Sequence, residues 1–210
     1  MNKIYFVTGR QDLYGEETLR QAAKDSAVIS GFLNEKLSDI AEVVFMPVVK
    51  TACEAEDICV QASSDKDCIG VIMWMHTFSP AKMWIRALKA LKKPMLHLHP
   101  QFNEKLPYDS IDMDFMNLNQ SAHGDREFGF ICTRLGIKRE VVVGYYRHED
   151  VTEKIRRFAY AASAVAFSRT LRVAMLGNNM RDVAVTDGDR VESEIRFGWN
   201  VNYYGIGDVA

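Results

Sequence analysis

The sequence predicts an α/β protein: a three-layer α/β/α domain with a parallel sheet of the Rossmann or flavodoxin type, followed by the beginning of a second α/β domain. Short apolar runs rich in β-branched residues alternate with longer stretches of helical spacing, which is typical of βαβ units. Residues 68–75 are almost continuously apolar, as in strands buried on both faces. We expect domains at 1–168 and 169–210.

Each strand of the first domain is predicted from a short apolar run that ends in glycine, proline or polar residues. The runs are Ile4–Val7, Val43–Pro47, Cys68–Met75, Pro94–His99 and Val141–Tyr145.

The helices between these strands are predicted from apolar residues spaced three and four apart. They cover about Glu16–Leu37, Thr51–Ser63, Pro80–Leu91, Gly124–Leu135 and Glu149–Ser168. Ser79 is predicted to cap the third helix, because serine followed by proline is typical of a helix start.

The second domain is predicted to contain one βαβ unit. Its strands are Thr170–Leu176 and Trp199–Tyr204, and its helix starts within Asp187–Asp189 and runs through Arg196 to a stop at Gly198. About forty residues bury too little surface for a core of their own. We therefore expect an exposed apolar face that includes Trp199, Tyr203 and Tyr204.

Composition excludes several classes of protein. A net charge of −2 and a pI of about 6.2 give no basic excess for nucleic acid or an acidic membrane. No apolar run approaches the roughly 18 residues that span a bilayer. The four cysteines show no CxxC spacing, so we expect them to be buried thiols in a cytoplasmic protein.

Polar side chains gather where apolar runs end. His76, His97, His99 and His123 lie at or just after such runs, and the long irregular segment Pro100–Ser121 follows the fourth strand. In an open parallel sheet, the crevice beyond the carboxyl ends of the strands is where ligands bind. These residues predict a neutral, hydroxylated small molecule as the ligand.

A zinc-like site formed by these histidines is an alternative. Neither strand that carries them contains an acid, and Met95 shares the face of His97 and His99, so we expect no metal. His97 is predicted to be a buried, hydrogen-bonded histidine, while His99 and His123 lie nearer the ligand. Asp125 is assigned to the first turn of its helix, where an acid complements the macrodipole.

Other candidate motifs are weak. Asp112 and Asp114 resemble a catalytic pair, but their spacing in a loop fixes no separation, and we expect them to hold the loop together with Asn119. No GxSxG or GxGxxG sequence is present, and residues 8–15 have the wrong spacing. This first loop either recognises hydroxyl groups through Gln11 and Tyr14 or simply forms a turn.

Taken together, several segments resemble the L-arabinose isomerase family along essentially the whole chain: Phe6–Gly15, Trp74–Trp84, His97–Asn103, Ser110–Phe130, Asn179–Arg181 and Phe197–Asp208. The resemblance implies an aldose–ketose isomerase that converts L-arabinose to L-ribulose through an enediol, usually with Mn²⁺. It also implies an N-terminal three-layer α/β domain, a similar middle domain of which 169–210 is the truncated start, and a homo-oligomer with shared active sites.

The resemblance assigns substrate-pocket positions, two of which, Gln120 and His123, would be supplied to a neighbouring subunit. The full set is Gln11, Leu13, Tyr14, Gln120, His123 and Met180. Two departures bear on pocket geometry: Asp12 replaces the family's usual histidine, and Met175–Asn178 replaces its usual Arg-Phe-Gly-Asp.

No catalytic residue is expected in this chain. The family's two metal-binding glutamates and two metal-binding histidines lie downstream, so Mn²⁺ is expected for the complete enzyme and not for this segment alone. We therefore predict that the 210 residues are inactive by themselves. The alternative is a non-catalytic sugar-binding or oligomerisation module, which metal-independent binding of L-arabinose in isothermal titration would favour.

Overall fold

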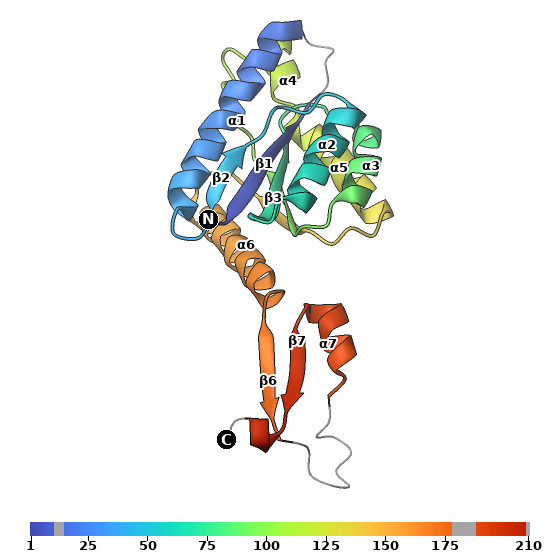
Figure 1. Ribbon diagram of the computed structural model, residues 1–210. Helices are drawn as coiled ribbons and strands as arrows, with labels where there is room; N and C mark the ends of the chain where they lie inside the picture. The colour runs from blue at the N-terminus through green and yellow to red at the C-terminus, as the bar shows by residue number, and fades with distance from the viewer. Residues whose placement is uncertain (11–14, 178–187, 209–210) are drawn as a thin grey trace. The chain divides into compact units, whose positions relative to one another are not determined.

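The computed structural model describes residues 1–10, 15–177 and 188–208 (Figure 1). Its contacts divide the chain into two compact units, Met1–Ala162 and Ser163–Ala210. The predicted domain boundary after residue 168 stays a prediction.

The first unit is built on a five-stranded parallel sheet, as predicted. Its strand order is β2-β1-β3-β4-β5. This is the doubly wound order in which successive crossovers reverse direction between β1 and β3. The strands are β1 (Lys3–Gly9), β2 (Glu42–Phe45), β3 (Cys68–Met75), β4 (Met95–His99) and β5 (Glu140–Val143).

Helices cover both faces of this sheet and complete the three layers (Figure 1). On one face, Arg156 of α6 donates hydrogen bonds to the Lys36 carbonyl at the end of α1 and to the Asp39 carboxylate. On the other face, α2, α3 and α5 pack into one apolar cluster with alternate residues of β1, β3 and β4. The bounds are α1 (Gly15–Leu37), α2 (Ala52–Ser64), α3 (Trp84–Ala90), α5 (Ser121–Arg134) and α6 (Glu149–Ser168).

The central strand β3 has all eight residues buried, which confirms its prediction as a strand covered on both faces. Met73 and Met75 belong to the cluster beneath α2, α3 and α5. Trp74 points to the opposite face, where its ring lies 6.4 Å from that of Phe6. Because successive side chains point to opposite faces of a strand, β3 contributes residues to the apolar core on each face of the sheet.

The starts of two helices differ in whether the local sequence alone predicts their cap. Thr51 caps α2 in a reciprocal capping box with Glu54, as its sequence favours. Ser79 does not cap α3. Its hydroxyl accepts a hydrogen bond from the Trp84 indole at 3.2 Å, and a 3₁₀ turn at Ala81–Met83 precedes the α-helix.

The segment between β4 and α5 is more regular than predicted, because it contains the short helix α4 (Met113–Leu118). Asp112 accepts from the Phe115 amide as its N-cap, and the Asn119 amide donates to the Phe115 carbonyl. This confirms the structural role expected of those two residues. Asp114 is exposed in the first turn.

Three of the four cysteines, Cys59, Cys68 and Cys132, are buried free thiols, whereas Cys53 is exposed. The expectation that all four are buried is therefore wrong for Cys53, which lies on the outer side of α2. Among the described residues, no helix is both long and apolar enough to cross a membrane.

The second unit pairs β6 (Arg172–Leu176) with β7 (Asn200–Tyr204) in parallel, with α7 (Arg190–Phe197) between them in sequence. A short 3₁₀ turn at Ile206–Asp208 follows. Asp189 caps α7, and Gly198 ends it in the left-handed conformation at φ 76°, as predicted. None of its described residues is buried.

Candidate functional site

The carboxyl end of β1 and β3 forms the switch point of the sheet, where polar side chains are buried. Arg10 follows β1 and is fully buried. His76 follows β3, and its Nε2 lies 2.8 Å from Oδ2 of Asp25 in α1. Both side chains are buried. In this fold the switch point is the ordinary place for a ligand.

Four of the six predicted substrate residues cannot be compared with the structure. Gln11, Leu13, Tyr14 and Met180 lie outside the described residues. They remain predictions.

The other two predicted residues, Gln120 and His123, lie together at the start of α5. Gln120 is the N-cap, and its carbonyl accepts from the His123 and Gly124 amides at 3.1 and 3.2 Å. His123 is exposed, and its ring lies 4.8 Å from that of Phe78. Both residues lie at the start of α5, and their role as substrate contacts stays a prediction.

A cavity of about 560 Å³ adjoins His123. It lies between the segment after β3 and the outer side of α5. Phe78, Phe130 and Ile131 give it apolar walls, and Lys82, Arg126 and Glu127 supply charge. The Ala81 amide donates to Glu127 at 3.4 Å across this cavity.

The start of α5 is held tightly against the sheet. A Cβ on Gly124 would lie 2.3 Å from the Thr77 carbonyl oxygen, so only glycine permits this approach. The Ser121 hydroxyl donates to the Pro100 carbonyl at 3.0 Å. Asp125 accepts from the Met75 amide at 3.2 Å. His123 is thus an exposed side chain on a fixed backbone.

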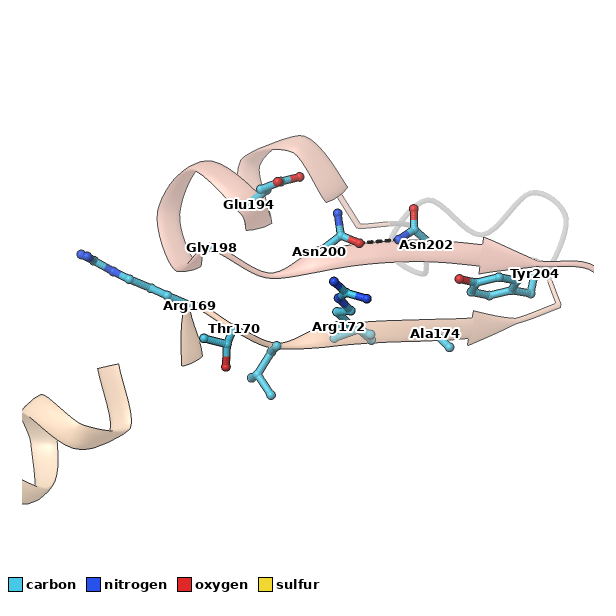
Figure 2. A pocket seen from close by; sticks show the side chains of 11 residues that line it. Arg169, Thr170, Arg172, Ala174, Glu194, Gly198, Asn200, Asn202 and Tyr204 are labelled. Atoms are coloured by element: carbon cyan, nitrogen blue, oxygen red, sulfur yellow. Dashed lines mark hydrogen bonds between the residues drawn. The ribbon is translucent and has the colours of Figure 1, made fainter. Parts of the chain in front are cut away.

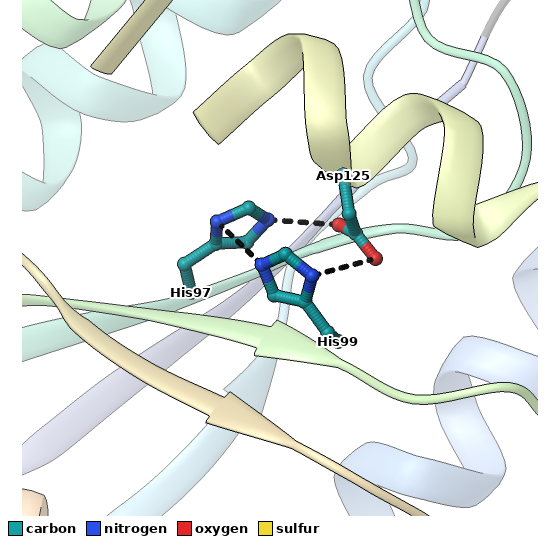
Figure 3. Close-up of side chains that lie close together, drawn as sticks. All are labelled: His97, His99 and Asp125. Carbon is teal, nitrogen blue, oxygen red and sulfur yellow. Dashed lines mark hydrogen bonds and ion pairs between the residues drawn. The ribbon is translucent and has the colours of Figure 1, made fainter. Parts of the chain in front are cut away.

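Asp125 also organises a buried polar chain with the two histidines of β4 (Figure 3). Asp125 Oδ1 lies 2.8 Å from His97 Nε2, and His97 Nδ1 lies 2.9 Å from His99 Nε2. His99 Nδ1 is 4.0 Å from Asp125 Oδ2, which has no hydrogen-bond partner. The assignment of Asp125 to the first helical turn is wrong, because α5 begins at Ser121 and Asp125 falls in its second turn, facing inward.

Burial shifts the titration of all three groups toward their neutral forms. Desolvation lowers the pKa of His97 to about 2, with further lowering by His99 and Arg139. Desolvation likewise lowers the pKa of His99, and Arg139 adds to it. The pKa of Asp125 is raised well above 3.8 by desolvation. A neutral chain of hydrogen bonds follows from these directions.

His97, His99 and Asp125 are close enough to be considered as metal ligands. The hydrogen bonds argue against that role. A metal between the nitrogens that face Asp125 would leave protons on His97 Nδ1 and His99 Nε2, because each neutral imidazole keeps one N–H. Those two N–H groups would then oppose each other at 2.9 Å. The arrangement suits a proton chain better than a cation.

Sequence reasoning missed both buried acid–histidine pairs, although a signal was present. Asp25 falls among the inward positions of α1 with Ala22 and Ile29, at helical spacing. Asp125 falls likewise with Phe128 and Cys132. An acid within an apolar stripe of a helix predicts a buried partner, because an uncompensated charge there is costly.

The second unit has a cavity of its own, of about 610 Å³, over one face of the two-stranded sheet (Figure 2). Arg172, Asn200 and Asn202 point into it, and the Asn202 amide donates to Asn200 Oδ1 at 2.6 Å. Glu194 of α7 and Gly198 also line this hollow.

Comparison with known proteins gives a consistent result. Residues 1–170 match the L-arabinose isomerase N-terminal domain, and residues 172–210 match the L-arabinose isomerase central domain. Proteins called L-arabinose isomerase from Geobacillus thermodenitrificans and Geobacillus stearothermophilus are 54% and 55% identical over 207 residues. One from Clostridium beijerinckii is 50% identical over 208 residues. Each match covers 99% of this chain but 42% of the relative.

Proposed function

The chain belongs to the L-arabinose isomerase family, and from that premise we propose that it forms part of the substrate pocket of an aldose–ketose isomerase acting on a pentose. The reaction is the conversion of L-arabinose to L-ribulose through an enediol. The chain supplies pocket wall and subunit interface, and the carboxylates that move the proton come from elsewhere.

The observation that carries this proposal is the placement of His123 and Gln120. His123 is exposed beside a cavity, yet the helix turn that bears it is fixed by Gly124, Ser121 and Asp125. An imidazole and an amide both donate and accept hydrogen bonds, which suits sugar hydroxyl groups. An exposed side chain on a rigid support suits a site completed by a second subunit.

The proton transfer itself requires a base within hydrogen-bond reach of the substrate carbon and stabilisation of the developing charge. Asp125 is a buried acid already bonded to His97, and burial raises its pKa and so favours its protonated form, which cannot accept a further proton from the substrate. The catalytic Mn²⁺ of the family does not fit the His97–His99–Asp125 cluster, whose hydrogen bonds occupy the nitrogens that would bind it. No step of the reaction is therefore assigned to this chain.

The proposal includes a homo-oligomer with shared active sites, no nucleic-acid partner and a cytoplasmic location. The near-neutral charge balance supports the absence of a nucleic-acid role. Buried free thiols at Cys59, Cys68 and Cys132 support a reducing compartment.

A chimera tests the proposal. The matching N-terminal part of the Geobacillus thermodenitrificans relative is replaced by this chain, and L-arabinose to L-ribulose conversion is measured with Mn²⁺. We expect turnover, and we expect His123→Ala to lower kcat/KM about tenfold or more, because a hydrogen bond to the substrate is lost.

The matched control is His148→Ala, which removes an exposed histidine that pairs with Glu104 and does not line the cavity beside His123. It should leave kcat/KM unchanged. An active chimera in which His123→Ala behaves like His148→Ala would contradict the assigned role of His123.

A further inference from the structure

The first unit has a further cavity, of about 730 Å³, at the carboxyl ends of β4 and β5. His99 lies at the end of β4, Gln101 and Asn103 follow it, and Tyr145 follows β5. Ser121 and Asp125 line it from α5. The cavity is separate from the one beside His123, because the two are lined by different sides of α5 and share only Arg126.

One buried polar atom in this cavity has no partner. Asp125 is 1% exposed, and its Oδ2 accepts no hydrogen bond, although Oδ1 is bonded to both His97 and the Met75 amide. Buried oxygens are almost always satisfied by a protein group, a water molecule or a ligand. The unsatisfied atom therefore marks a position where a donor from the cavity would bind.

The neighbouring nitrogen, His99 Nδ1, requires that the same ligand group also accept a hydrogen bond. In the neutral chain, Asp125 donates to His97 Nε2, His97 Nδ1 donates to His99 Nε2, and His99 carries its proton on Nδ1. His99 Nδ1 and Asp125 Oδ2 are 4.0 Å apart, so one oxygen can lie at about 2.8 Å from both. A hydroxyl group there accepts from Nδ1 and donates to Oδ2.

The rest of the lining favours a molecule with several hydroxyl groups. The side-chain amides of Gln101 and Asn103 offer donors and acceptors, and the ring of Tyr145 offers an apolar face for C–H groups. Arg126 and Glu104 both line the cavity, so its lining carries one charge of each sign.

We propose that this cavity binds a neutral polyhydroxylated small molecule, a free sugar or sugar alcohol, through a hydroxyl group bridging His99 Nδ1 and Asp125 Oδ2. This site is distinct from the His123 cavity. It is argued from the cavity alone and does not rest on the proposed isomerase role.

The test uses the 210-residue chain labelled with ¹⁵N and titrated with ribitol, while the imidazole nitrogens of His99 are followed by NMR. We expect saturable shifts of His99 with a Kd of about 5 mM, the affinity that a ligand of this size reaches at ordinary efficiency. Gluconate, a polyol of similar size with a negative charge, should bind at least about tenfold more weakly.

His99→Phe should weaken ribitol binding at least about tenfold, because it removes the donor at the bridge. Lys82→Ala, which changes an exposed residue of the other cavity, should bind ribitol as the original chain does. Circular dichroism checks that each variant is folded. If His99→Phe is not folded, Tyr145→Leu decides, and it should weaken binding about threefold through loss of the ring face.

Three results would overturn the proposal. The first is the absence of saturation, which would mean that water alone satisfies Asp125. The second is binding that His99→Phe, or Tyr145→Leu in its place, leaves unchanged. The third is binding that disappears in Lys82→Ala, which would place ribitol in the other cavity.

Discussion

The two units of this chain are built from the same kinds of element but differ in what covers them. In Met1–Ala162, the five-stranded sheet has helices on both faces, and residues such as Trp84 and Phe128 are fully buried. In the described part of Ser163–Ala210, two parallel strands and a helix form, yet no residue is buried.

The difference shows that local sequence can define helices and strands without defining a core. Helix α7 has a capping aspartate and a glycine stop, but Val191, Ile195 and Phe197 are 68%, 73% and 50% exposed. A pair of strands alone is marginally stable in water, because it lacks a second layer to bury its apolar face. Stability in this chain should therefore reside in the first unit.

Matched phenylalanine substitutions give the largest expected contrast. Phe128→Ala removes a ring packed edge-on against Trp84, with centroids 5.5 Å apart, and should lower the free energy of unfolding by about 3–5 kcal/mol. Phe197→Ala removes a half-exposed ring and should change it by less than about 0.5 kcal/mol. Urea denaturation measures both. Equal losses would show that the second unit has a core after all.

A matched pair of glycine substitutions compares the two units by adding a single methyl group to each. Gly124→Ala places a methyl group 2.3 Å from the Thr77 carbonyl, so α5 must move, at a cost of about 1–3 kcal/mol. Gly207→Ala meets no atom within 4 Å and should stay within about 0.5 kcal/mol. A Gly124→Ala protein as stable as the original in the same urea titration would argue against tight docking of α5.

The smallest effect concerns pH and the buried chain of the first unit. Unfolded His97 takes up a proton below about 6.5 and folded His97 does not until about 2, so its contribution to stability falls as pH falls through that window. Folded Asp125 keeps a proton that the unfolded chain releases above about 3.8, so its contribution falls as pH rises. His97 and Asp125 therefore change the free energy of unfolding in opposite directions as pH rises.

Asp125→Asn should remove the loss of stability with rising pH that Asp125 causes. Between pH 4.5 and 6, the free energy of unfolding of this variant should rise more steeply with pH than that of the original chain, toward about 1.4 kcal/mol per pH unit. Urea titrations at several pH values measure it, with the exposed Asp114→Asn as control. Parallel curves for the original chain and Asp125→Asn would show that Asp125 is not held protonated.

The secondary structure of both units was predictable because the hydrophobic spacing is regular. Strand β3 and helix α6 have the bounds that were predicted from sequence. The role of Ser79 and the start of α5 were predicted wrongly, because tertiary contacts decided them. The Ser79 hydroxyl accepts a hydrogen bond from Trp84, and Asp125 bonds a strand that is distant in sequence.

The candidate site was predictable only in part. Gln120 and His123 follow from resemblance to a family, and the structure places them side by side at one helix start. The cavity beside His99 could be identified only from the structure. Its unsatisfied oxygen comes from α5 and its donor from β4, and no sequence spacing links residues 99 and 125.

The central claim is that this chain builds pocket wall while the proton-moving groups lie outside it. The most direct measurement is conversion of L-arabinose to L-ribulose by the purified 210-residue chain with Mn²⁺, beside the chimera under identical conditions. The account predicts turnover by the chimera and none by the chain alone. Metal-dependent turnover by the chain alone would contradict it.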